Sequence, residues 1–75
     1  MLQVFSAEWC GACKTVKKFL QDGGIDFQER DIEKDPDAYQ MLMDLKLRSI
    51  PVVYLDDDNY VVGFDKDKIL ELAKK

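Results

Sequence analysis

The 75-residue sequence predicts a small α/β fold. Apolar residues switch between a spacing of two and a spacing of three to four along the chain, and strand-like and helix-like segments alternate. The predicted order is strand, helix, strand, helix, strand, strand, helix, with a parallel pair first and an antiparallel hairpin later. We expect residues 1–75 to form one domain, because a chain of this length has room for a single core.

The elements of the first half are set by apolar spacing. Leu2–Phe5 is a short apolar run that predicts a buried strand. A helix should span Gly11–Asp22 and end at the two glycines that follow, since glycine commonly stands after a helix. A second strand is predicted at Ile25–Ile32. The residues expected to face inward are Cys13, Val16, Phe19 and Leu20 in the helix, and Phe27 and Ile32 in the strand.

Asp35 and Pro36 indicate the start of a second helix, because proline is tolerated in a first turn. The residues expected to form its core face are Tyr39, Leu42, Met43 and either Leu45 or Leu47. Pro51 then precedes Val52–Leu55, a β-branched run that predicts a buried strand. Proline cannot donate to a sheet ladder and therefore fits a strand's first residue. The residues alone do not decide between a cis and a trans Ile50-Pro51 bond.

The acidic turn Asp56–Asn59 should join that strand to a fourth at Tyr60–Val62 as a hairpin. Three adjacent aspartates raise the question of calcium, but the spacing of an EF-hand loop is absent, so we predict a solvated turn. Gly63 should end the hairpin, and Asp65 should cap a last helix. The residues expected to pack inward from that helix are Ile69, Leu70, Leu72 and Ala73.

The segment Trp9-Cys10-Gly11-Ala12-Cys13 places two thiols one helical turn apart at the junction of the first strand and the first helix. Unpaired backbone amides and the positive end of the helix dipole favour a thiolate there. We expect Cys10 to be the nucleophile, its pKa lowered toward neutrality from the roughly 8.5 of a free cysteine. Cys13 should be better buried and should resolve the mixed disulfide. The motif predicts thiol–disulfide redox chemistry.

Other roles for the two cysteines fit the sequence less well. A structural zinc site needs four ligands, and the chain has two cysteines and no histidine, so we expect no bound metal. A bridge across a two-residue spacer constrains the unfolded chain very little, which argues against a purely structural disulfide. The missing histidine also excludes a Cys-His hydrolase of the usual form.

Composition and charge limit the partners. The net charge of −4 argues against nucleic-acid binding through a basic field, so we expect protein partners. The apolar stretch Met1–Phe5 is too short for a signal peptide and lacks a basic leader, and we expect a cytoplasmic protein that does not enter a membrane. In that compartment, paired cysteines are more often catalytic than structural. No large apolar patch is evident beyond the motif, so a monomer is expected.

Two segments resemble the thioredoxin/glutaredoxin superfamily, Phe5–Lys14 and Leu47–Pro51, and the likeness extends over essentially the whole chain. It implies a minimal thioredoxin fold, a four-stranded mixed sheet of order 2-1-3-4 flanked by three helices, with a cis bond before Pro51. It also implies a thiol–disulfide oxidoreductase without a cofactor, in which Cys10 attacks and Cys13 resolves. The implied substrate-binding residues are Trp9, Gly11, Ala12, Ile50, Pro51, Gly63 and Phe64.

Within the superfamily, the length and the segment Val62–Ile69 look like NrdH-redoxins, small redoxins that donate electrons to ribonucleotide reductase, and like small phage redoxins. The implied partners are a thioredoxin-reductase-type flavoprotein and disulfide-containing proteins such as ribonucleotide reductase. A glutathione-dependent glutaredoxin is the alternative. Phe64 stands where glutaredoxins usually have a second glycine, and Glu8 stands in place of a basic residue, so both disfavour glutathione. A non-redox binding subunit is disfavoured by the presence of both cysteines.

Two departures from the thioredoxin pattern bear on mechanism. Val4 stands where thioredoxins carry a buried aspartate thought to move the proton of the second thiol, so we expect water to take the proton from Cys13. Electrostatic help could come from the first-helix lysines, Lys14, Lys17 and Lys18, although such residues usually form a solvated face. Ala12 replaces the usual proline, and we expect a reduction potential between about −270 mV, as in thioredoxin, and roughly −200 mV, as in glutaredoxins.

Overall fold

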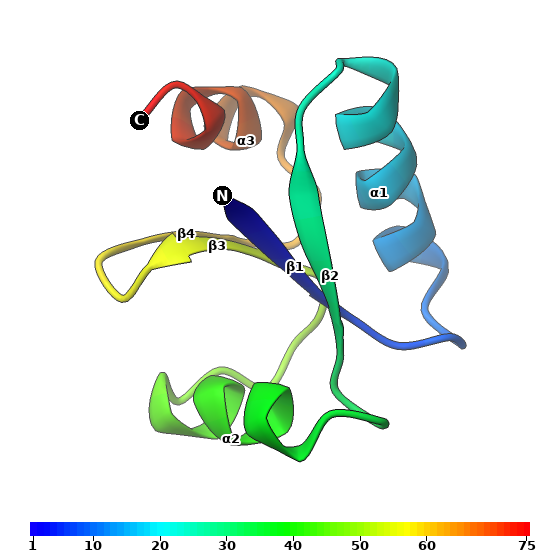
Figure 1. Cartoon of the computed structure of the whole chain (residues 1–75), viewed down its shortest axis with the longest axis vertical. Coiled ribbons are helices and arrows are strands. Elements are labelled where there is room, and N and C mark those ends of the chain that lie inside the picture. Colours follow the sequence, from blue (N-terminus) through cyan, green and yellow to red (C-terminus); the bar gives the residue numbers. More distant parts are fainter.

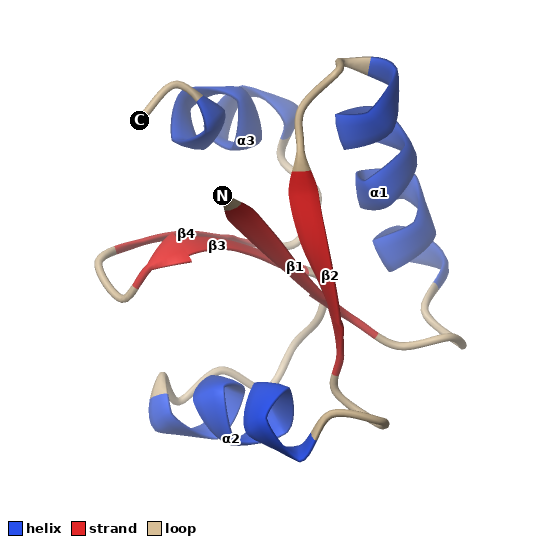
Figure 2. Cartoon of the chain, viewed as in Figure 1, coloured by secondary structure: helices blue, strands red, loops and turns tan.

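The computed structural model describes all 75 residues, and its strands and helices follow the predicted order. The elements are β1 Leu2–Ser6, α1 Gly11–Asp22, β2 Phe27–Asp31, α2 Pro36–Asp44, β3 Val52–Asp56, β4 Asn59–Val62 and α3 Lys66–Ala73. The strands form one sheet in the order β2-β1-β3-β4 (Figure 2). β1 runs parallel to β2 and antiparallel to β3, and β3 and β4 form the expected hairpin. None of the three helices is long and apolar enough to span a bilayer.

Helices cover both faces of the sheet, with α1 and α3 on one face and α2 on the other (Figure 1). The core beneath α1 and α3 contains Leu2, Val4, Val16, Leu20, Val53, Val61, Ile69 and Leu72. The smaller core beneath α2 contains Phe5, Ala38, Leu42, Val52 and Tyr54. Successive side chains of a strand point to opposite faces, so neighbouring residues of β1 and of β3 serve different cores.

Each helix begins at a side chain that the sequence places there. Cys10, Asp35 and Asp65 are the N-caps of α1, α2 and α3, and each accepts a backbone N–H of the first turn. Asp35 Oδ2 also accepts a hydrogen bond from Arg30 Nε at 3.0 Å. The backbone N–H of Ala38 and the Arg30 guanidinium hold the pKa of Asp35 below its usual value. At the start of α1, the capping side chain is the first cysteine itself, because Cys10 accepts the backbone N–H of Cys13.

Tyr39 does not join the core, contrary to the prediction. Its side chain is 50% exposed, whereas Ala38 and Leu42 are buried beneath α2. Residues four apart share one helix face, and a neighbour lies about 100° away around the axis, so burying Ala38 and Leu42 turns Tyr39 outward. Met43 is half-buried at the edge of the same core. The helical spacing was read correctly, but the buried face is narrower than expected.

The buried face of α3 is also narrower than predicted. Ile69 and Leu72 are buried, whereas Leu70 is 41% exposed and Ala73 is exposed, so the inward placement of the latter two was wrong. An eight-residue helix at the side of the sheet reaches the core through one pair of residues three apart. β2 is also shorter than predicted and spans Phe27–Asp31.

Candidate active site

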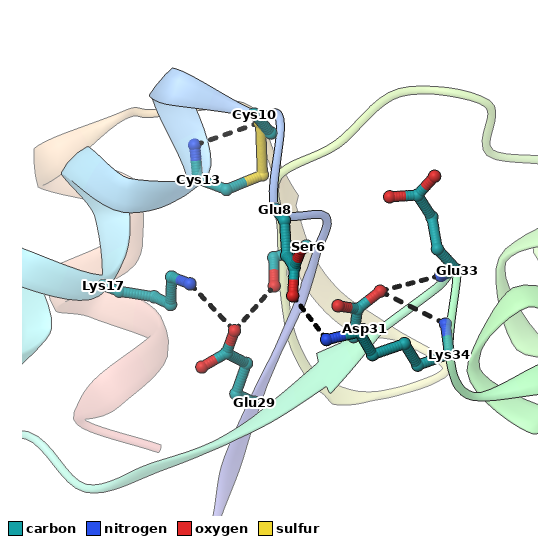
Figure 3. Close-up of polar contacts among 9 residues, drawn as sticks. All are labelled: Ser6, Glu8, Cys10, Cys13, Lys17, Glu29, Asp31, Glu33 and Lys34. Atoms are coloured by element: carbon teal, nitrogen blue, oxygen red, sulfur yellow. Dashed lines mark hydrogen bonds and ion pairs between the residues drawn. A yellow bond between two sulfur atoms is a disulfide. The ribbon is translucent and has the colours of Figure 1, made fainter.

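Cys10 and Cys13 form a disulfide at the start of α1, next to the turn that leaves β1 (Figure 3). Their Cα atoms lie 5.3 Å apart. Cys10 has extended backbone angles as the N-cap residue, and its sulfur accepts a hydrogen bond from the Cys13 N–H at 3.1 Å. In the reduced protein, this N–H and the positive end of the helix dipole would stabilise a thiolate on Cys10. The geometry supports Cys10 as the attacking sulfur.

The two cysteines differ in access to solvent. Cys10 is 6% exposed, whereas Cys13 is fully buried. Both pack in one cluster with Ala7, against which Ile32 and Ile50 also pack. A sulfur in the interior can be reached by its neighbour but not by a bulky protein substrate. The arrangement therefore favours a first bond between substrate and Cys10, followed by attack of Cys13 on that bond.

Three of the predicted binding residues come together at the cis-proline. The Ile50-Pro51 bond is cis, as the family resemblance implied. The carbonyl of buried Pro51 accepts a hydrogen bond from the Gly63 N–H at 2.8 Å. Gly63 has φ +84, in the left-handed region that glycine adopts readily. Neither the N–H nor the C=O of Ile50 is bonded to another backbone group, so both are available next to the cysteines.

The remaining predicted binding residues lie on the surface. Trp9 is 69% exposed, and Gly11 and Ala12 are exposed in the first turn of α1. Phe64 is 38% exposed, and its ring packs edge-to-face on Phe19 of α1 with centroids 5.6 Å apart. Phe64 is thus held against the side of α1, whereas the indole of Trp9 is open to a partner.

An apolar pocket beside the site was not predicted. It has a volume of about 440 Å³ and is lined by Ile32, Tyr39, Leu42, Met43, Leu47 and Arg48. Ile32 also packs against the cysteine cluster, so the pocket adjoins the active site. The signal in the sequence was Tyr39, an aromatic residue at helical spacing. Its role in a surface pocket depends on how α2 is rotated over the sheet, which the spacing does not specify.

Three polar contacts near the motif were also missed. Ser6 is 1% exposed, and its hydroxyl donates to Glu29 Oε1 at 3.4 Å. Lys17 Nζ donates to the same oxygen at 2.8 Å (Figure 3). The carboxylate of Glu8 accepts a hydrogen bond from Lys34 and raises the pKa of that ammonium. These partners lie far apart in the sequence, so their pairing depends on strand register and loop positions.

Comparison with known proteins identifies the family. The glutaredoxin family model matches residues 2–61. The glutaredoxin-like protein NrdH of Lactococcus lactis subsp. cremoris is 33% identical over 73 residues, which cover 97% of this chain and 100% of that protein. The gene 56 protein of Mycobacterium phage D29 is 28% identical over 72 residues, which cover 95% of this chain and 80% of that protein.

Solved structures agree with the sequence relatives. The NrdH-redoxin of Escherichia coli superposes with a TM-score of 0.85 at 27% identity, covering 95% of this chain and 92% of that one. A buckwheat glutaredoxin in complex with glutathione gives a TM-score of 0.68 at 26% identity, covering 97% of this chain and 67% of that one. Together with the Cys10/Cys13 pair, these matches show that the chain belongs to the glutaredoxin family and is an NrdH-like thiol–disulfide oxidoreductase with a thioredoxin-like fold.

Proposed function

We propose that this chain reduces disulfides in proteins and that a thioredoxin-reductase-type flavoprotein restores its dithiol. The substrate we propose is ribonucleotide reductase. One observation carries the proposal: Cys10 stands at the helix N-cap with a backbone N–H on its sulfur, while Cys13 is fully buried behind it. The similarity to NrdH proteins supports it, and the E. coli NrdH-redoxin is described as having a thioredoxin-like activity profile.

The chemistry moves two electrons from the dithiol to the substrate. The Cys10 thiolate attacks one sulfur of the substrate disulfide, and the other sulfur leaves as a thiolate. Cys13 then attacks Cys10 Sγ, which forms the Cys10–Cys13 bond and releases the second substrate sulfur. The bridge present in the structure is the product of this cycle.

We propose that the substrate lies extended across the rim of the site. The free N–H and C=O of Ile50 could pair with its backbone and place the disulfide at Cys10 without requiring a particular sequence. The side chains and backbone expected to contact it are Trp9, Gly11, Ala12, Ile50, Pro51, Gly63 and Phe64. The neighbouring pocket at Ile32 has room for one apolar side chain of the partner.

A glutathione-dependent glutaredoxin is the second candidate, favoured by the family and by the likeness to a glutathione-bound glutaredoxin. Two features of the site weigh against it. Glu8 stands next to Trp9 in place of a basic residue, and it pairs with the ammonium of Lys34, so that cation is not free to bind the carboxylates of glutathione. Phe64 places a ring where glutaredoxins usually have a glycine. A non-redox binding subunit is the third candidate. Such a subunit would not need one cysteine at the helix N-cap and a second cysteine buried behind it.

We also propose that the chain works as a monomer in the cytoplasm. Cys10, Cys13, Ile50 and Pro51 all come from one chain, so no second copy is needed to complete the site. A dithiol that acts as a reductant needs a compartment that keeps thiols reduced. With a net charge of −4, its partners are expected to be proteins and not nucleic acids.

The test is the consumption of NADPH with a disulfide substrate, measured once with thioredoxin reductase and once with glutathione and glutathione reductase. We expect turnover with thioredoxin reductase and little with glutathione. Turnover only with glutathione would replace the proposal by the glutaredoxin alternative. Cys10→Ser and Cys13→Ser serve as matched controls, since both should abolish a redox role and leave a binding subunit functional.

A further inference from the structure

We propose that Lys34 is a positioning residue for the docking of protein substrates: by binding Glu8, it holds the turn that presents Trp9 beside Cys10. The inference rests on the proposed function and deepens it, since it says what orders the exposed indole before a protein disulfide arrives. A tight turn, a rigid loop and the ion pair between them carry it.

Trp9 stands at the corner of a tight turn between β1 and α1. The Cys10 N–H donates to the Ala7 carbonyl at 3.1 Å, so Glu8 and Trp9 are the two central residues of the turn. The indole is 69% exposed and has no aromatic or cation–π partner in the chain. Its direction therefore depends on the backbone of the turn. A contact that fixes Glu8 also limits the movement of Trp9.

The loop between β2 and α2 is a fixed support beside this turn. The Asp31 carboxylate accepts the backbone N–H groups of Glu33 and Lys34, at 2.8 and 3.3 Å. The Asp31 carbonyl also accepts the Lys34 N–H at 3.2 Å, and the next residue, Asp35, caps α2. Aspartate commonly forms a turn of this kind with the residues that follow it. The backbone of Lys34 is thus held from both sides.

The turn and the loop are joined next to the cysteines. The Ile32 N–H donates to the Ser6 carbonyl at 3.0 Å, and the Ile32 side chain packs against the cysteine cluster. Farther out, the Lys34 ammonium binds the Glu8 carboxylate (Figure 3). Glu8 and Trp9 make no other side-chain hydrogen bond, so Lys34 is the one side chain bonded to either central residue of the turn.

A fixed turn favours association with a protein more than reaction with a small disulfide. A protein that covers the indole must stop the motion of the turn, and the lost entropy weakens binding. If the turn is already held, this loss is smaller. A small disulfide reaches Cys10 without covering Trp9, so its reaction should not depend on Lys34.

The test compares two disulfides after rapid mixing with the reduced protein: insulin, which is a protein, and 2-hydroxyethyl disulfide, which is small and uncharged. Lys34→Met keeps the length of the side chain and removes its charge. Because exposed ion pairs are weak, we expect the rate constant with insulin to fall about two- to fivefold. The rate constant with 2-hydroxyethyl disulfide should be unchanged, because the chemistry of Cys10 is unaffected.

Trp9 is the single tryptophan of the chain, so its fluorescence reports on the turn directly. In the reduced protein, the decay of its fluorescence anisotropy should contain a larger nanosecond component in Lys34→Met than in the wild type. Lys34→Arg should restore both the anisotropy and the insulin rate, because a guanidinium also pairs with a carboxylate. Thermal melting of each variant checks that the fold is retained.

Variants at Glu8 separate the ion pair from a simple effect of charge. Glu8→Met and Lys34→Met change the net charge in opposite directions, so an effect of charge alone would move the insulin rate in opposite directions. Loss of the ion pair should lower the rate in both, and the double variant should lose no more than either single one. Asp22→Met is the matched control, because it breaks an exposed pair with Lys18 at the other end of α1. It should change neither readout.

The outcomes are distinct. An unchanged anisotropy in Lys34→Met, or a more mobile indole with the wild-type insulin rate, would show that the inference is wrong. Opposite effects of Glu8→Met and Lys34→Met, or an equal loss of rate with 2-hydroxyethyl disulfide, would also overturn it. A wild-type protein that reduces 2-hydroxyethyl disulfide but not insulin would refute the proposed function itself, and the docking role of Lys34 with it.

Discussion

Substitution of Val4 by aspartate would put a carboxyl group into the core beneath α1 and α3. Val4 is fully buried in a cluster of eight buried apolar residues. Its partner in register on β2 is Glu29, whose charge would oppose a second negative charge on this face. Burial and like charge both favour the neutral acid, so the pKa of the new carboxyl in the folded state should lie well above its unfolded value of about 3.9.

The size of the effect follows from that pKa. Burial of this kind raises a carboxyl pKa by roughly 3 units, and each unit corresponds to about 1.4 kcal/mol. The unfolded chain then releases its proton at lower pH than the folded one. The variant should therefore keep its stability below about pH 4 and lose ~4 kcal/mol as the pH rises to about 7. For 75 residues the whole free energy of unfolding is roughly 4 to 11 kcal/mol, so the loss is severe.

The assay is urea unfolding followed by far-ultraviolet circular dichroism between pH 4 and pH 7. Val4→Asn is the matched control, because it introduces a polar group of the same shape that does not titrate. The free energy of unfolding of Val4→Asp should match that of Val4→Asn at the acid end and fall below it by about 4 kcal/mol at pH 7.

If the difference in unfolding free energy between the two variants stays constant with pH, residue 4 does not lie in a dry apolar core. The same variant also bears on the chemistry. If Val4→Asp remains folded near neutral pH and reduces disulfides with an unchanged rate and pH profile, removal of the Cys13 proton is not rate-limiting.

Three further substitutions give independent tests. Ala12→Pro should lower the reduction potential toward the roughly −270 mV of thioredoxin, as measured by titration against dithiothreitol. The hydrogen bond from the Tyr54 hydroxyl to Asp57, together with burial, raises the pKa of Tyr54 to about 12. Since an unfolded tyrosine ionises near pH 10, stability should decline above about pH 10, and Tyr54→Phe should abolish that decline. Phe64→Gly should raise turnover with glutathione several-fold in the glutathione reductase assay.

Each of these has a contradicting outcome. If the reduction potential of the wild-type protein already lies below that of thioredoxin, Ala12 does not raise it, and the expectation for Ala12→Pro is wrong. Tyr60 lies opposite Tyr54 on β4, and a Tyr60→Phe control should keep the alkaline decline. If both phenylalanine variants retained it, the Tyr54 hydroxyl would not be its source. Unchanged glutathione turnover in the Phe64 variant would show that the ring is not what excludes the tripeptide.

The sequence predicted those parts of the structure that depend on local chemistry. The bounds of α1 were found because a cysteine caps its start and glycines follow its end. The order of burial of Cys10 and Cys13 follows from a helix that begins between them. The cis bond before Pro51 was predicted from the family resemblance, because the residues alone did not decide between cis and trans. These features involve neighbours in the chain or a motif that is specific to the superfamily.

The features that were missed depend on long-range geometry. The link from Ser6 to Glu29 exists because β1 and β2 pair in one particular parallel register, which polar alternation in β2 does not reveal. Tyr39 was read as core because it stands at helical spacing, but the rotation of α2 places it beside a surface pocket. In both cases the sequence supplied the correct element and could not supply its position relative to a neighbour.

The proposed mechanism requires that Cys10 attacks the substrate and that Cys13 resolves the resulting mixed disulfide. Its most direct test is to mix reduced Cys13→Ser with a disulfide-containing protein and to search for a covalent adduct by mass spectrometry. We predict a stable mixed disulfide at Cys10 in Cys13→Ser and none in Cys10→Ser. An adduct at Cys13 in Cys10→Ser, or no adduct in Cys13→Ser, would contradict the assignment of the two sulfurs.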